Sequence, residues 1–131
     1  MSLVDLISTL MDDAEAAVVV TDGELKEPGP HILYVNAAFE RMTGFGRDEL
    51  LGRSPRMLQG PATSLAARKQ LARALRSGRT HEASLVNYRK SGEAYRCAVR
   101  VFPVTGHDGR LVNAVAIERE VERRPGRPRK A

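Results

Sequence analysis

The sequence predicts an α+β domain in which a five-stranded antiparallel sheet carries helices packed on one face. The first observation is the order of patterns along the chain, which runs strand, strand, several helices, then three strands. The second is that turn dipeptides and glycines join the last three strand patterns as hairpins. Because hairpin-linked strands are antiparallel and 131 residues fit one domain, we expect a single sheet around one core.

The chain begins with a helix pattern followed by two strand patterns. Val4, Ile7, Leu10 and Met11 recur at helical spacing after Ser2, a suitable N-cap, so residues 1–15 are predicted to hold a short amphipathic helix. The next strands are expected in AAVVVTD and ILYV, with Gly and Pro between them. These two strands open the predicted domain, which covers residues 16–122.

Three helix patterns occupy the middle of the chain. They are NAAFERMTG from Asn36, GRDELLG from Gly46, and SLAARKQLARALRSG from Ser64. In the third pattern we expect Leu65, Leu71 and Leu75 near one face, with Thr63 or Ser64 as the cap. The closing strands are predicted in THEASLVNYRK, EAYRCAVRVFPV and LVNAVAIERE.

The positive charge of the chain is concentrated at its C-terminus. Residues 123–131 contain five basic residues and no acidic one, which accounts for the whole formal net charge of +5. Rich in Pro and Arg, this segment is predicted to be a disordered tail. Its sequence PGRPRK resembles an AT-hook, so it either makes a weak DNA contact in the minor groove or only improves solubility.

Several classes of protein are disfavoured by composition. Cys97 is the only cysteine, so the chain has no internal disulfide or CxxC pair, and we expect a reducing, cytoplasmic location. No apolar run reaches the roughly 18 residues of a membrane span, and the histidines lack metal-ligand spacing. No nucleophile with a paired histidine and no phosphate-binding glycine loop is visible, so we expect no enzymatic activity.

Three segments carry motifs known from one protein family: GRSPRMLQGP from Gly52, NYRKSG from Asn87 and AVAIERE from Ala114. In these segments the chain resembles the PAS domain family, and more narrowly its LOV (light-oxygen-voltage) subclass. In LOV proteins the first segment reads GRNCRFLQGP, and its cysteine attacks the excited ring of bound flavin mononucleotide (FMN). Pro55 stands at that position and has no nucleophile. The resemblance therefore implies a PAS fold and an FMN pocket without cysteinyl-adduct photochemistry.

The resemblance also implies which residues contact FMN. Arg56 matches the arginine that pairs with the flavin phosphate, Gln59 the glutamine near the ribityl chain and ring, and Asn87 an asparagine at the pyrimidine edge. Ser54 replaces an asparagine and keeps only a hydroxyl. The alternative is that Gln59 and Asn87 bond backbone in turns while Arg56 is a surface charge.

Two positions depart from the LOV pattern at the pyrimidine edge of the flavin. Cys97 replaces a second asparagine, and its simplest role is that of a small core residue. Glu118 replaces the glutamine whose amide flips when the flavin changes state. Because burial favours a protonated carboxyl, Glu118 either stays neutral beside a ligand, points outward, or indicates that no flavin is bound.

A third departure concerns the phosphate. Ala72 replaces a second phosphate-binding arginine, and Arg68, Lys69 or Arg73 on the same helix could take over its role. The direction of these side chains does not follow from the sequence.

Together these features predict a PAS/LOV-like sensory or protein-interaction module that binds FMN and signals as a homodimer to a downstream protein. Two alternatives stay open. One is a DNA-associated regulator that uses the basic tail, and the other is a ligand-free dimerisation scaffold.

Overall fold

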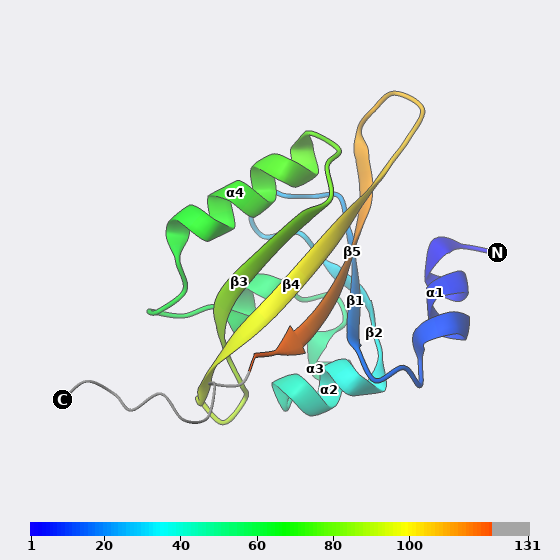
Figure 1. The fold of residues 1–131 in the computed structure, drawn as a ribbon. Coiled ribbons are helices and arrows are strands. Elements are labelled where there is room, and N and C mark those ends of the chain that lie inside the picture. Colours follow the sequence, from blue (N-terminus) through cyan, green and yellow to red (C-terminus); the bar gives the residue numbers. More distant parts are fainter. Residues whose placement is uncertain (122–131) are drawn as a thin grey trace.

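The computed structural model describes residues 1–121, so the predicted tail and its DNA contact lie outside the described residues. Within them, five strands form one sheet in the order β2-β1-β5-β4-β3, and every neighbouring pair is antiparallel (Figure 1). The predicted α+β fold with a five-stranded antiparallel sheet is confirmed. No helix among the described residues is long and apolar enough to cross a membrane.

Each predicted helix and strand is present. The helices are α1 (Leu3–Met11), α2 (Ala37–Thr43), α3 (Arg47–Leu50), the 3-10 helix η1 (Pro55–Leu58) and α4 (Leu65–Arg76). The strands are β1 (Ala17–Asp22), β2 (Ile32–Val35), β3 (His81–Tyr88), β4 (Ala94–Thr105) and β5 (Leu111–Glu120).

Asn36 connects three of these elements. Its side chain is fully buried and caps α2 by accepting from the backbone N–H of Phe39 at 3.1 Å, and it also accepts from Val18 of β1 at 2.9 Å. The same amide donates to the carbonyls of Met11 and Ala16, at 2.8 and 2.9 Å. One buried side chain with every bond satisfied thus sets the path from α1 into the sheet and α2.

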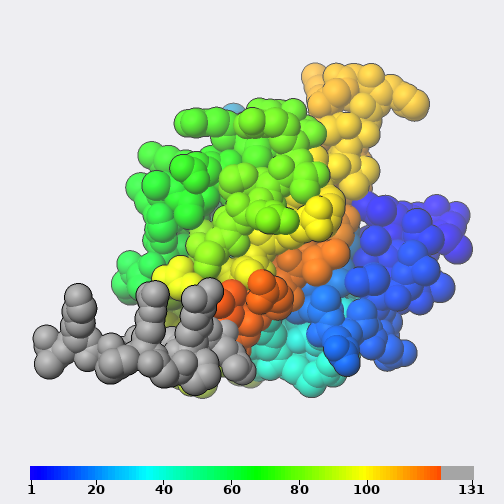
Figure 2. Space-filling model, in the orientation of Figure 1, coloured from blue at the N-terminus to red at the C-terminus, as the bar shows by residue number. Residues whose placement is uncertain are grey.

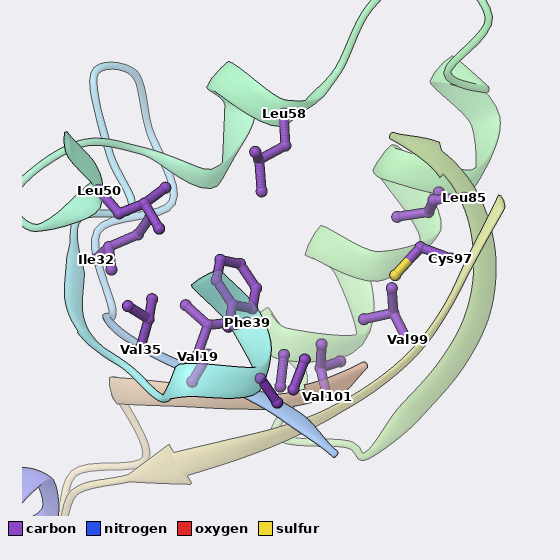
Figure 3. Packing of buried hydrophobic residues seen from close by; sticks show 14 of the residues in the cluster. Val19, Ile32, Val35, Phe39, Leu50, Leu58, Leu85, Cys97, Val99 and Val101 are labelled. Carbon is purple, nitrogen blue, oxygen red and sulfur yellow. The ribbon is translucent and has the colours of Figure 1, made fainter. Parts of the chain in front are cut away.

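The inner face of the sheet, defined as the face covered by α2, α3, η1 and α4, carries the main core. Figure 3 shows Phe39 and Leu58 from the helices above Val19, Val99 and Val101 of the strands. The predicted inward position of Phe39 is therefore confirmed.

The outer face of the sheet is covered in part by α1. Val4 and Ile7 of α1 pack against a small cluster that includes Val18, Tyr34 and Val115. Leu10, which shares the helical spacing of these residues, is 65% exposed and lies at the edge of the packed face of α1. In Figure 2, α1 covers one part of this face while β4 and β5 remain exposed beside it.

One prediction for α4 was wrong. Leu65 is 55% exposed, whereas Leu75 is buried and Leu71 is half-buried. Six residues turn an α-helix by about 600°, so Leu65 lies about 120° around the axis from Leu71. The inward stripe of α4 instead runs through Arg68, Leu71, Ala72 and Leu75.

Candidate functional site

A cavity of about 160 Å³ lies between the inner face of the sheet and the helices. One wall, the sheet wall, comes from β1, β3, β4 and β5, and the opposite wall, the helical wall, comes from η1 and α4. Leu25 and Pro30 of the β1–β2 loop complete it. The lining is mainly apolar, and its polar side chains are Thr21, Arg56, Gln59, Arg68, Asn87 and Glu118.

Glu118 is the carboxyl group of the sheet wall. It lies on β5, the central strand, and is only 8% exposed. Burial raises the pKa of Glu118 to about 7, against the lowering effect of a hydrogen bond from Cys97. The structure thus excludes one alternative from the sequence, because the side chain points into the domain.

Cys97 faces the same side of the sheet as Val99 but does not line the cavity. Its side chain is fully buried near Leu85 and Val99 (Figure 3). The Sγ atom donates to Oε1 of Glu118 at 3.3 Å. Burial and the neighbouring Glu118 both raise the pKa of this thiol, so it stays protonated. Cys97, predicted at the flavin edge, is therefore placed as a core residue that supports Glu118.

Asn87 also belongs to the sheet wall. It is buried within β3, two residues along the strand from Leu85, and it lines the cavity. The alternative that Asn87 bonds backbone in a turn does not hold, because the residue lies inside a strand.

The GRSPRMLQG segment forms η1 and its flanks on the helical wall. Pro55 begins η1 and lines the cavity at the position of the LOV cysteine. Ser54 instead caps η1, accepting from the backbone N–H of Arg56 at 3.3 Å, and does not line the cavity. The structure thus places Ser54 in a local structural role.

Arg56 lines the cavity, but two of its three guanidinium nitrogens already donate to backbone carbonyls. Its Nε donates to the carbonyl of Gly29 at 2.8 Å, and Nη2 donates to the carbonyl of Leu25 at 2.7 Å. The side chain is therefore more than a surface charge, because it holds the β1–β2 loop against η1.

Arg68 is the cavity residue whose role sequence reasoning left undecided. Of the three candidates on α4, Arg68 lines the cavity, whereas Lys69 and Arg73 are exposed. Its Nη1 donates to Oε1 of Gln59 at 3.0 Å, and its Nε is buried without a partner in the described part of the chain. The spacing of Arg68 from Leu71, Ala72 and Leu75, at i, i+3, i+4 and i+7, was the signal that could have found it.

This arrangement suits a ligand with an apolar body, an amide-like edge and an anionic group. Asn87 and Glu118 provide acceptors and donors on the sheet wall, and two guanidinium groups stand on the helical wall. The described residues contain no cluster of side chains able to hold a metal ion.

Comparison with known proteins identifies the family. The model of the PAS domain family matches residues 15–123. The chain is 36% identical over 108 residues to a blue-light-activated histidine kinase of Rhizobium johnstonii, covering 82% of the chain and 31% of that protein. It is 36% identical over 91 residues to Protein TWIN LOV 1 of Arabidopsis thaliana, covering 69% of the chain and 23% of that protein. The chain therefore spans less than a third of the length of these curated relatives.

Solved structures agree with this family. The LOV domain of the Erythrobacter litoralis EL346 blue-light activated histidine kinase superposes with a TM-score of 0.74 at 30% identity, over 82% of this chain and 97% of that one. The Rhodobacter sphaeroides LOV protein superposes with a TM-score of 0.82 at 27% identity, over 94% of this chain and 69% of that one. The chain belongs to the PAS domain family. Within that family it is a LOV-type sensory module, as its sequence motifs predicted.

Proposed function

We propose that this chain binds FMN in the cavity and responds to light or redox state without thiol addition. The observation that supports the proposal is that one cavity collects Arg56, Gln59, Asn87 and Glu118 from segments far apart in the sequence. These are four of the six residues that the LOV resemblance assigns to FMN. Bound flavin would supply blue-light absorption and electron acceptance.

The side chains that line the cavity suit a flavin, but the cavity is smaller than a flavin needs. The buried, unpartnered Nε of Arg68 offers a donor to an anionic group, and the amides of Gln59 and Asn87 offer polar edges. The volume of about 160 Å³ lies below the roughly 300–1,000 Å³ of typical ligand sites. Binding therefore requires the helical wall to move away from the sheet, and we expect only partial occupancy.

The response to light would then involve electron and proton transfer. Pro55 lines the cavity where a thiol would attack. Cys97 cannot substitute, because it is a protonated core thiol that does not line the cavity. Glu118 is placed to hold or release a proton at its carboxyl oxygens near neutral pH, since its pKa is raised to about 7.

Absorbance of the purified full chain before and after blue light tests this proposal. We expect a weak flavin spectrum that Glu118→Gln strengthens, because the substitution places an amide able to donate and accept on the cavity wall. Illumination should give no reversible thiol-dependent loss of the blue band. Such a loss that disappeared in Cys97→Ala would contradict the proposed response, and failure of both the wild type and Glu118→Gln to bind any flavin would favour a ligand-free scaffold.

For signalling we propose a homodimer formed through the outer face of the sheet and α1, which then contacts a downstream protein. On β5 the inward Glu118 alternates with Ile117 and Arg119, which face outward. A change in the protonation or contacts of Glu118 would therefore act directly on its neighbours in β5, which lie on the surface that would meet a partner. The chain itself would act as a sensor without catalysis.

A further inference from the structure

The two arginines of the helical wall differ in what their donors already bind. The Nε and Nη2 atoms of Arg56 donate to carbonyls of the β1–β2 loop, and its Nη1 lies 3.9 Å from Glu27. A ligand that recruited Nε or Nη2 of Arg56 would have to break bonds that hold the β1–β2 loop, which leaves only Nη1, beside Glu27. Arg56 thus has a structural role, because it holds the β1–β2 loop in place.

Within the described residues, the side chain of Arg68 instead makes no hydrogen bond to the backbone and has an unpartnered nitrogen. Its guanidinium bonds only Gln59 through Nη1, and Nε is buried without a partner among residues 1–121. Within the same residues, no carboxylate forms an ion pair with Arg68. A buried donor of a charged group without a partner is destabilising, which an anionic ligand oxygen would relieve.

Arg68 can also replace the second phosphate-binding arginine of the LOV pattern, which is absent at Ala72. Ala72 lies one helical turn further along the same inward stripe and has no donor. A guanidinium four residues earlier reaches the same cavity because i and i+4 share a helix face.

We propose that Arg68 binds the anionic group of the ligand, a phosphate monoester, while Arg56 acts as a positioning residue that holds the β1–β2 loop. This inference rests on the proposed flavin site. It assigns to Arg68 the preference of that site for a phosphorylated flavin over an unphosphorylated one. The phosphate-binding role has moved by one turn of α4 relative to the LOV pattern.

Binding of FMN and riboflavin to the full chain separates the two arginines, because riboflavin is the same ring system without the phosphate. Arg68→Gln is expected to weaken FMN binding about tenfold and to leave riboflavin binding unchanged. Arg56→Gln is expected to weaken both ligands by a similar factor, since it loosens the loop. Lys69→Gln, an exposed neighbour on α4, is the matched control and should change neither. Thermal unfolding of each variant checks that it is folded.

The outcomes distinguish this inference from the proposed function. Selective loss of FMN binding in Arg56→Gln, or equal affinity of the wild-type chain for both flavins, would overturn the role of Arg68 while leaving a flavin site. If neither flavin binds, the proposed function fails, and inorganic phosphate becomes the probe. Phosphate should then raise the melting temperature of the wild type over chloride at equal ionic strength, and Arg68→Gln should remove the effect. Absence of that effect in the wild type would overturn the phosphate site as well.

Discussion

The two faces of the sheet are built from the same strands but are closed in different ways. The inner face is covered by α2, α3, η1 and α4 and contains buried polar groups beside the cavity. Among residues 1–121, the outer face is covered only by α1, next to exposed Arg96, Arg100 and Arg119 on β4 and β5. Because residues alternate along a strand, β5 carries Glu118 inward and its neighbours outward. One strand therefore connects the cavity with the exposed part of the outer face.

The two faces also differ in the free energy of placing charged groups on them. On the inner face a charge must be taken out of water, so the protonation of Glu118 is coupled to folding. On the outer face the arginines stay solvated, so each contributes little to stability.

The largest expected effect is at Glu118. Its folded pKa of about 7 lies above the ordinary carboxyl value of 4.5, so between these pH values the folded chain keeps a proton that the unfolded chain has released. Stability must then fall as the pH rises through this window, by roughly 3 kcal/mol once the pH exceeds 7. Glu118→Gln should remove this dependence and be the more stable form at pH 8, as measured by urea unfolding at pH 5 and pH 8.

Glu82→Gln is the matched control for this experiment. Glu82 is exposed on β3 beside Arg100, so its substitution should change stability by no more than about 0.5 kcal/mol at either pH. Besides burial, the group that modifies the pKa of Glu118 is Cys97, through its hydrogen bond. The same pH slope in Glu118→Gln as in the wild type would show that another group is responsible.

A smaller effect is expected on the outer face. Ile7 of α1 is half-buried against the cluster under this helix, so Ile7→Ala should lower the free energy of unfolding by about 1–2 kcal/mol, less than a fully buried site. Leu10→Ala, at the exposed side of the same helix, is the control and should cost under about 0.5 kcal/mol. Equal effects of the two substitutions in urea unfolding would argue against docking of α1 on its own sheet.

Most of the fold could be predicted from the sequence because local signals agree with the tertiary structure. Ser2 caps α1 as expected, and Gly44 ends α2 with φ of +77°, a conformation that glycine adopts readily. The error at Leu65 arose because leucine favours a helix without specifying which face is buried.

The cavity could be predicted only in part. The motif indicated that Arg56, Gln59 and Asn87 would come together, and all three line the cavity. The partners of Arg56 could not be predicted, because they are backbone carbonyls of a loop about 30 residues earlier in the chain. Nor did the sequence separate Arg68 from Lys69 and Arg73, since three cations on one helix have the same propensity and differ only in the face they occupy.

The smallest free-energy change is predicted for the proposed dimer. The exposed side of α1 carries Asp5, Leu6 and Leu10, and exposed Asp13 follows the helix, whereas the open part of the sheet carries arginines. A second copy therefore offers complementary charge and apolar surface.

Arg119→Glu should weaken self-association by between about twofold and about thirtyfold, because an exposed ion pair contributes about 0.2–1 kcal/mol and occurs twice in a two-fold dimer. Light scattering or sedimentation over micromolar concentrations measures this, and added salt should reduce the difference between the two proteins. Arg53→Glu makes the same charge change at an exposed turn between α3 and η1, away from the outer face, and should have no effect. A wild-type chain that stays monomeric throughout, with or without residues 1–15, would mean that the outer face is not a self-association surface. The alternation of Glu118 and Arg119 along β5 would then connect the cavity to a different partner.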